Sequence, residues 1–481
     1  MSAQWSDLLS AALVGTERRP APDLLNDAAE LAVARRAAVP ALEGLTLPEP
    51  APEETAPAAP AAASVRLAGL LDAQGGGVEA RLDLVVEWLT AAVDRGLRVS
   101  PAVLPELLDA ARAHRSLRPL VAAAGGARAP WLAAQNPTWA YLWSPADTGN
   151  PAAWEEGTLP QRVAHLRAVR AKDPDAGREL LESGWAGEGG EDRAPLLEAL
   201  RVNLSAADEA LLERALDDRR REVRNRALAL LAELPDSGYG RRMADRARAA
   251  VQRDGPLLRV DPPAVCDSAM QRDGIVPKPP AGVGARTWWL EEVVARTPLQ
   301  AWPPDLLRLT VADGWDRVLH RALARAAAGQ RAADWAAALL DLLEPQVKAD
   351  PRPDDVFLLE SLYEVLPAAE RADRAVAKLR SPDDEAGLDR LLDLCPAPWP
   401  PELVAAFRDD LVALVRRSGT GRRVRERSRI AATRLPPDPA LLDGILAGAD
   451  DRDVANMAAR QAVERLAETL RFRHDMIEEL S

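Results

Sequence analysis

Residues 205–234 read SAADEALLERALDDRRREVRNRALALLAEL and carry the clearest helical pattern of the chain. Its apolar residues recur at intervals of three and four in two segments, which is the spacing of one buried helix face. The first segment would bury Leu211, Leu212 and Leu216. The second would bury a longer row, Val223, Ala227, Leu230, Leu231 and Leu234. Asp217-Asp218 ends the first helix, and a short turn rich in arginine follows it. The stretch therefore predicts an antiparallel helix pair.

This helix pair resembles a HEAT-type repeat. The HEAT pattern has an Asp five residues before a Val-Arg pair, and here Asp218 precedes Val223-Arg224 at that spacing. Neither helix of such a pair can bury its apolar stripe alone, so the units stack, and an Asp–Arg ladder between turns can tie neighbours together. Asp218, Val223 and Arg224 are therefore the predicted ladder residues.

Two weaker copies of the pattern follow in the second half of the chain. Asp313 and Val318 keep the spacing, but Leu319 stands where the Arg is expected. Val424-Arg425 repeats the pair, but Gly419 takes the position of the Asp. We therefore expect an all-α protein, a HEAT-like helical-repeat solenoid of antiparallel helix pairs that could be divided into two halves. A generic helical bundle is the alternative.

The composition agrees with packed helices. Of 481 residues, 47% are hydrophobic and 28% are charged. Strands favour β-branched and aromatic residues, but the chain has four Ile, three Phe and three Tyr. An extensive β fold is therefore not expected. The apolar mass is Ala, Leu and Val, as in helices that pack against one another.

Helical periodicity covers most of the chain outside 205–234. One face of a helix that ends near Gly96 carries Leu82, Val85, Val86, Leu89 and Val93. Another face, within 403–415, carries Leu403, Val404, Phe407, Leu411 and Leu414. A long terminal helix would be lined by Val454, Ala458, Ala462, Leu466 and Leu470. These patterns predict helices joined by short turns, as a helical stack requires.

Two proline-rich stretches divide the chain into predicted parts. Residues 1–39 hold short N-terminal helices, and 40–64 form a Pro/Ala-rich linker in which six prolines exclude regular structure. Residues 65–251 form an N-terminal helical-repeat half, and 286–481 form a C-terminal half. Between them, 252–285 is a Pro-rich loop that marks a domain boundary or a functional surface loop.

A wider resemblance covers nearly the whole chain. It rests on ALVGTERRP at 12–20, the Trp154/Arg162/Asp173-Pro174/Gly177-Arg178/Trp185 spacing, LEALRVNLSAADEALLERALDD at 197–218, LPDSGYGRRM at 234–243 and RDGIVPKPP at 272–280. These segments resemble an uncharacterised bacterial family, one of the domains of unknown function. The resemblance implies gene neighbours that encode AAA+ ATPases of the MoxR type, von Willebrand A-domain proteins and SWIM zinc-finger proteins. It therefore implies a helper or scaffold in such a system, with no catalytic residues to carry over.

The charge distribution offers candidate binding surfaces. The net charge is −13, so the chain as a whole would be repelled by nucleic acid and by anionic membranes. Arginines gather nevertheless in 239–253 and in 416–429, RRSGTGRRVRERSR. The candidate partner or anion surface consists of Arg241, Arg242, Arg246, Arg416, Arg417, Arg422, Arg423 and Arg425. These arginines could bind an acidic protein, grip phosphates on a concave face, or simply be solvated.

Two tryptophans complete the candidate surface. Trp302 in AWPP and Trp399 in APWPP stand beside prolines, and such segments lie in loops, where a solenoid presents contacts. The thirteen tryptophans of the chain could equally fill gaps between helices of Ala and Leu. Trp302 and Trp399 could therefore either pack between helices or form part of a partner surface.

No motif for catalysis, cofactor binding or metal binding emerges. The four His lack a second His at ligand spacing, and Cys266 and Cys395 are too far apart in sequence to suggest a zinc site. We therefore predict no catalytic, cofactor-binding or metal-binding residue and no cofactor. The N-terminal apolar run follows Asp7 instead of a basic segment, and no apolar run reaches membrane-spanning length. A cytoplasmic protein without a membrane partner is expected, with its cysteines present as buried thiols.

These observations favour a non-enzymatic α-solenoid scaffold or adaptor that binds a protein partner. The resemblance suggests an AAA+ ATPase or a von Willebrand A-domain protein as that partner. The alternative is a nucleic-acid-binding HEAT-like protein, similar to the HEAT-like DNA glycosylases, that uses the Arg-rich turns.

Overall fold

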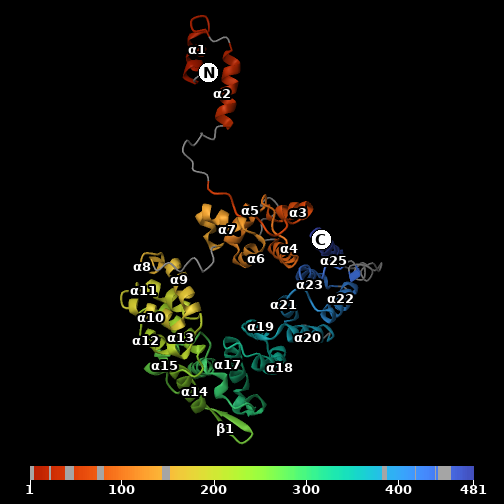
Figure 1. Ribbon diagram of the computed structural model, residues 1–481. Coiled ribbons are helices and arrows are strands. Elements are labelled where there is room, and N and C mark those ends of the chain that lie inside the picture. The colour runs from red at the N-terminus through yellow and green to blue at the C-terminus, as the bar shows by residue number, and fades with distance from the viewer. Residues whose placement is uncertain are drawn as a thin grey trace. The chain divides into compact units, whose positions relative to one another are not determined.

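The computed structural model describes residues 5–20, 23–37, 48–72, 81–142, 152–381, 387–417, 419–438, 440–441 and 457–481. The chain divides into two compact units, 1–53 and 54–481. The first unit holds helices α1 (Trp5–Val14) and α2 (Leu24–Ala37), which contact each other (Figure 1). Gly15, with φ +93°, ends α1, because this left-handed conformation suits glycine. Leu8 and Ala11 of α1 are buried.

The second unit begins with a group of short helices. They are α3 (Ala61–Leu71), α4 (Leu82–Asp94), α5 (Leu104–Ala113), α6 (Arg118–Ala124) and α7 (Arg128–Gln135), with 3₁₀ turns η3 (Arg115–Leu117) and η4 (Pro137–Leu142). The face predicted for 82–93 is confirmed at Val85 and Leu89, which are fully buried. Helix α3 begins inside the segment 40–64 that was predicted as a linker. Pro60 precedes its first turn and alanines fill that turn, so a helix starts there readily.

Helices α8 to α14 follow. Their bounds are α8 (Ala152–Glu155), α9 (Leu159–Lys172), α10 (Pro174–Gly184), α11 (Gly190–Ala199), η6 (Ala206–Asp208), α12 (Glu209–Ala215), α13 (Arg221–Ala232) and α14 (Gly238–Ala250). The helix pair predicted for 205–234 is confirmed as α12 and α13, which contact each other. The predicted apolar rows are buried, except that Leu234 is partly exposed. Capping boxes at Thr158 and Ser205 set two of the helix starts.

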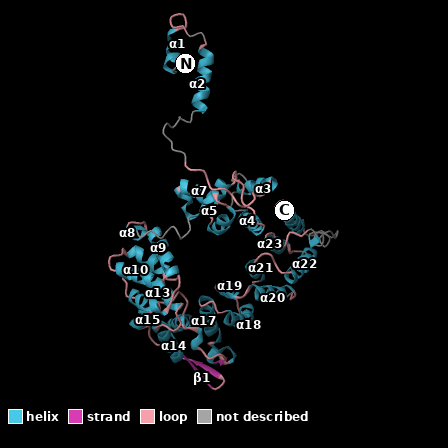
Figure 2. Ribbon diagram, viewed as in Figure 1, coloured by secondary structure: helices cyan, strands magenta, loops and turns pink. Residues whose placement is uncertain are grey.

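A small three-stranded sheet interrupts the helices. Strands β1 (Val251–Asp254) and β2 (Leu257–Val260) form an antiparallel hairpin, and β3 (Thr310–Val311) pairs with β2 in parallel. Gly255, with φ +61°, makes the hairpin turn. Figure 2 shows the strands beside α14. The fold is therefore mostly helical, as predicted, but the sheet corrects the all-α expectation.

The stretch 252–285 does not divide the hydrophobic core. It contains β2 and helix α15 (Ser268–Arg272), and Leu258, Met270 and Ile275 are buried in a core that runs from Leu166 to Leu470. Proline content predicted a loop or boundary here because proline signals irregular backbone but does not report burial. The segment is a folded part of the unit.

The remaining helices complete the second unit. They are α16 (Ala285–Arg296), α17 (Asp316–Gly329), α18 (Ala333–Ala349), α19 (Asp355–Val365), α20 (Ala368–Leu379), α21 (Leu388–Leu394), α22 (Pro401–Arg416), α23 (Gly421–Ala431) and α25 (Met457–Glu478), with 3₁₀ turns η7 (Leu299–Ala301), η8 (Leu306–Arg308) and η9 (Ala312–Gly314). The faces predicted within 403–415 and in the terminal helix are buried at Leu403, Phe407, Leu411, Leu414, Ala462, Leu466 and Leu470. Ala458 is exposed, and Val454 lies outside the described residues.

Helix contacts in this unit are mainly local. From α9 to α23, each helix other than the short α15 packs against a helix that is next or next but one along the chain. Helix α25 is different because it contributes to two hydrophobic cores. Its residues Ala459 to Leu470 belong to the large core, whereas Met476 and Leu480 near the C-terminus are buried in a second core with α3 to α7.

Candidate functional site

The first arginine cluster is engaged inside the protein. Asp273, of which 1% is exposed, accepts hydrogen bonds from Arg242 Nη2 at 2.6 Å and from Arg246 Nη1 at 2.6 Å. Arg242 also donates to Glu213 at 3.0 Å. Burial opposes ionisation of Asp273, but the two arginines outweigh it and hold the pKa of this carboxyl below its ordinary value. Arg242 and Arg246 therefore fasten α14 to the segment after α15, which corrects their prediction as a partner surface.

Arg241 behaves differently from its two neighbours. It is exposed, and its guanidinium donates to the carbonyl oxygen of Asp236 at 2.6 Å. It lines a shallow pocket of about 390 Å³ between the start of α14 and the turn at Pro298. Of the three arginines predicted in this region, Arg241 alone keeps an exposed side chain.

The second arginine cluster lies on the surface around the turn between α22 and α23. We call Arg416, Arg417, Arg422, Arg423 and Arg425 the arginine turn. All five are exposed. Four of them, Arg416, Arg417, Arg422 and Arg425, make no side-chain hydrogen bond or ion pair with the described part of the chain.

The start of α23 places positive charge where a helix does not favour it. The first turn of α23 contains Arg422 and Arg423 and no acidic residue. A helix N-terminus carries a partial positive charge, so arginines there repel it. The Arg429 hydrogen bond is the largest cause of the lowered pKa of the Glu426 carboxyl, and the Arg422 charge lowers this pKa further. The arginine turn is thus a basic surface on an acidic chain.

Arg427 in the same sequence cluster is a core residue. It is 2% exposed and donates to Asp389 at 3.1 Å and to Asp410, so it joins α21, α22 and α23. The sequence held a signal for this, because Arg427 stands three residues after the buried Val424, on the same helix face.

Both candidate tryptophans are buried. Trp302 is 6% exposed and Trp399 is 3% exposed. The Trp399 ring meets the Phe407 ring edge-on at 5.1 Å between centroids, and its indole N–H donates to the Cys395 carbonyl at 3.4 Å. Neighbouring prolines predicted exposure, but large rings fill gaps between Ala- and Leu-rich helices. Trp302 and Trp399 are therefore packing residues, which corrects the prediction of a partner surface.

The predicted ladder residues make contacts between successive segments. The Asp218 carboxylate accepts from Arg193 Nη1 of α11 at 2.7 Å and from the Arg220 backbone N–H at 2.9 Å. Arg224 donates to the carbonyl oxygens of Asp218 at 2.7 Å and Arg219 at 3.0 Å instead of to a carboxylate. Val223 is fully buried. Asp218 thus joins α11 to the turn before α13, and Arg224 closes that turn.

The structure also contains a pocket that the sequence did not predict. We call it the Glu291 pocket. It has a volume of about 850 Å³, and its walls are the loop 280–284, the first half of α16, one face of α17 and the start of α19. Two indole N–H groups anchor the segment just before this loop, since Trp288 donates to the Val276 carbonyl at 3.0 Å and Trp289 to the Pro277 carbonyl at 3.1 Å.

Glu291 is half-buried in this pocket. Burial raises the pKa of its carboxyl, and Glu292 adds to this, whereas Arg321, Arg325 and Arg352 act in the opposite direction. No hydrogen bond or ion pair from the described residues reaches the carboxylate. A carboxylate with unsatisfied acceptor capacity in a pocket can accept a hydrogen bond from a ligand.

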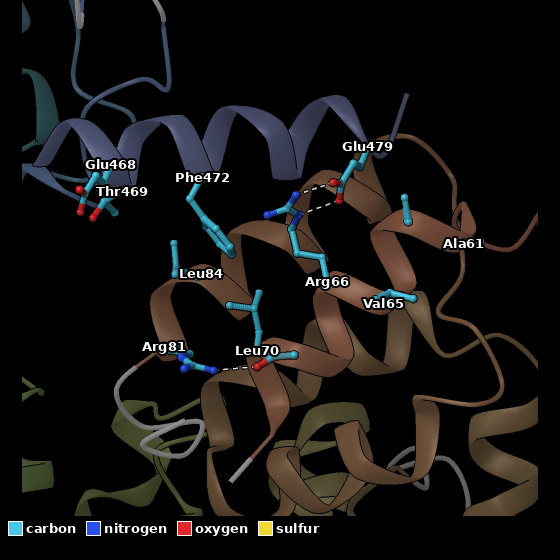
Figure 3. Close-up of a pocket in the computed structure, with 12 residues that line it drawn as sticks. Ala61, Val65, Arg66, Leu70, Arg81, Leu84, Glu468, Thr469, Phe472 and Glu479 are labelled. Atoms are coloured by element: carbon cyan, nitrogen blue, oxygen red, sulfur yellow. Dashed lines mark hydrogen bonds and ion pairs between the residues drawn. The ribbon is translucent and has the colours of Figure 1, made fainter. Parts of the chain in front are cut away.

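A second unpredicted pocket is an apolar groove of about 940 Å³ along α3, α4 and α25. In Figure 3, Phe472 of α25 points toward Leu84 of α4, and Arg66 faces Glu479 across the groove. Arg66 Nε donates to Glu479 at 2.7 Å, and the guanidinium lies 4.7 Å from the Phe472 ring centroid. Arg66 and Glu479 are thus paired with each other, and Arg81 at the border donates to the Gly69 carbonyl at 2.7 Å. The rest of the groove offers mainly apolar surface.

The chain was compared with known proteins. Residues 7–480 match the model of a family of unknown function (DUF5691). The chain belongs to this family. No curated protein and no solved structure matches it. The family assignment confirms the resemblance to a domain of unknown function over nearly the whole chain.

Several motif residues of this DUF5691 chain have structural roles. Arg242 and Asp273 join LPDSGYGRRM to RDGIVPKPP. Arg162 binds Glu188 at 3.0 Å and lies 4.8 Å from the Trp154 ring centroid. The first contact joins two motif segments, and the contact between Arg162 and Trp154 lies within one motif.

The described residues of this DUF5691 chain contain neither a cluster of metal ligands nor a membrane-spanning helix. Among those residues, no three His, Cys, Asp or Glu side chains gather as they would around a metal ion. None of the described helices combines the length and the apolar character needed to cross a lipid bilayer.

Proposed function

We propose that this protein is a non-enzymatic, cytoplasmic scaffold or adaptor that binds an acidic surface of a protein partner. The observation that carries the proposal is the arginine turn, whose five exposed arginines belong to a chain with a net charge of −13. Such a local reversal of charge favours an oppositely charged partner and repels a second copy of the same patch.

The second part of the proposal is a HEAT-like helical-repeat arrangement. Ion pairs between neighbouring segments support it, because they recur at similar sequence separations. The separations are 38 residues for Arg170–Asp208, 31 for Arg242–Asp273, 33 for Arg325–Glu292 and 34 for Arg321–Asp355. A stack of similar helix pairs would produce such a recurrence, since each unit contacts its next neighbour. The local helix contacts from α9 to α23 fit the same arrangement.

The partner that we propose is an AAA+ ATPase of the MoxR type or a von Willebrand A-domain protein. The test is co-purification of the tagged full-length chain with each candidate from the same genome, with and without ATP. We expect the double variant R422E/R425E to lose capture of the partner, and R248E to keep it. Arg248 is a suitable control because it is exposed and pairs with Asp245 on its own helix. Failure of every candidate to co-purify with the wild-type chain would contradict the proposal.

Nucleic acid is the second candidate, favoured by the same arginines. Phosphate binding releases counterions, so affinity for duplex DNA would fall steeply with salt. Electrophoretic mobility shifts of a DNA duplex over a salt series separate the two functions. Salt-dependent DNA binding that R422E/R425E abolishes would favour the nucleic-acid function. Absence of DNA binding at low salt would leave the protein partner as the function.

A further inference from the structure

We propose that the Glu291 pocket is a docking site for a peptide segment in which an acidic residue neighbours a large apolar residue. This inference concerns a surface other than the arginine turn and rests on separate observations. The first observation is that arginines near the pocket share buried carboxylates. The second is that apolar side chains are exposed at the pocket. The third is that the Glu291 carboxylate can accept a hydrogen bond.

The arginines of the pocket share their carboxylate partners. Asp355, buried at the start of α19, accepts from both Arg317, at 2.6 Å, and Arg321. Glu292, buried in α16, binds both Arg296, at 2.7 Å, and Arg325, at 2.8 Å. The Glu292 carboxylate thus balances two guanidinium groups. Asp355 also serves two, although Arg317 has a second partner in Asp350, at 2.8 Å.

Two arginines near the pocket are open to a ligand. The Arg325 side chain is 41% exposed and the Arg352 side chain is 52% exposed. Arg352 lies 3.7 Å from its acidic neighbour Asp350, which is beyond hydrogen-bond distance. An incoming carboxylate could therefore bind Arg325 or Arg352, and arginine is well suited to carboxylates because its planar fork offers two donors.

Apolar side chains lie beside these charges. Phe357 is 70% exposed, although it is a large aromatic residue in the first turn of α19. Its neighbour Val356 is exposed as well, and Trp288 and Val283 line the same pocket. Adjacent exposed apolar residues at the edge of a pocket are typical of an interaction site. These apolar side chains would contact the large apolar residue of the peptide.

Glu291 supplies an acceptor that the pocket itself does not use. Extended peptides bring backbone N–H groups that need acceptors when a partner covers them. Glu291 is less exposed than Arg325 or Arg352, so a segment whose carboxylate binds these arginines could place a backbone N–H on Glu291. Asp354 also lines the pocket and would disfavour a peptide with many acidic residues. The ligand is therefore a short acidic and apolar motif rather than a polyacidic tract.

The test is binding of fluorescein-labelled peptide pools to the full-length protein by fluorescence anisotropy. The first pool pairs Asp or Glu with Phe, Leu or Trp at varied spacing. A second pool replaces the acids by Lys, and a third replaces the apolar residues by Ala. We expect the first pool to bind at least about tenfold more tightly than either of the others. Equal binding of all three pools, or binding of none, would overturn the inference.

Variants locate the binding site. R352E and F357A should each weaken binding of the first pool about tenfold, because both side chains are exposed and neither supports the core. R286E and V265A are the matched controls, since Arg286 pairs with Asp261 on the exposed side of α16 and Val265 is exposed outside the pocket. Unchanged binding by R352E and F357A would contradict the inference.

Two further measurements separate this site from others. E291Q should retain binding of the first pool because its amide oxygen still accepts a hydrogen bond, whereas E291A should weaken it. Inorganic phosphate or glutarate should compete poorly, and full competition by either would make this a small-anion site instead. R422E/R425E should leave peptide binding unchanged, so failure of the proposed adaptor function and failure of this inference are distinguishable.

Discussion

Arg473 and Glu87 form a two-pronged ion pair although 386 residues separate them. The Arg473 Nε donates to Glu87 at 2.6 Å and its Nη2 donates at 2.7 Å. Arg473 Nη1 also donates to the carbonyl oxygens of Ala432 and Leu435 at 2.9 and 2.6 Å. One buried guanidinium therefore joins α4, the end of α23 and α25, at the place where α25 passes from one hydrophobic core to the other.

We expect E87Q to destabilise the protein by about 3 kcal/mol, because removal of one partner leaves the buried Arg473 charge poorly compensated. The measurement is the free energy of unfolding in urea. E464Q on α25 is the control, since Glu464 is an exposed partner of Arg460 and such pairs contribute at most about 1 kcal/mol. Equal losses of unfolding free energy in the two variants would show that the Arg473–Glu87 pair stabilises the protein no more than an exposed pair does.

Helix positions were predictable from the sequence, whereas helix partners were not. The periodicity of Leu403, Phe407 and Leu411 indicated which face is buried, and the structure confirms that face. Periodicity carries no information on which acidic residue an arginine meets. Arg242 and Arg473 each stand three residues after a buried apolar residue, Tyr239 and Leu470, but the sequence does not tell which carboxylate each arginine meets.

D273N should destabilise the protein by about 3 kcal/mol, since Arg242 and Arg246 lose the carboxylate that they share. The pKa of Asp273 is lowered in the folded state, so its contribution is fully present above the unfolded value of about 3.9. That contribution is lost as the pH falls through the folded pKa. Urea unfolding at several pH values should show the difference between wild type and D273N closing in strong acid.

The matched control for D273N is D245N. Asp245 is an exposed partner of Arg248, and its replacement should change the unfolding free energy little at any pH. A gap between wild type and D273N that does not narrow below about pH 3 would contradict the assigned role of the Asp273 charge.

His320 should reduce stability in mild acid. Burial lowers its pKa, although Asp316 acts in the opposite direction, and its Nδ1 lies 3.1 Å from Gln346 Nε2. Below the unfolded value of about 6.5 the unfolded chain binds a proton that the folded protein resists, so stability falls with decreasing pH. H320Q should remove this part of the slope in thermal unfolding between pH 7 and the folded pKa, and an unchanged slope would exclude the role.

The candidate surfaces were partly predictable. The arginine turn followed from local charge, because arginines gather in 416–429 of a chain that is acidic as a whole. Trp302 and Trp399 were assigned to a surface from neighbouring prolines, although large rings are commonly buried. The Glu291 pocket could not be predicted, because it combines a loop, two neighbouring helices and α19, and its acidic residue looks ordinary in sequence.

The two cysteines should differ in reactivity toward Ellman's reagent. Burial raises the pKa of Cys395 to about 11, with Arg371 and Arg434 acting against it, and Cys395 is fully covered. At pH 8 about one thiol in a thousand would be ionised there. Burial also raises the pKa of Cys266, but this side chain is partly exposed. We expect Cys266 to react slowly in the native protein and Cys395 to react after unfolding in guanidinium. C266S should abolish the native reaction, whereas rapid modification of native C266S would show that Cys395 is accessible.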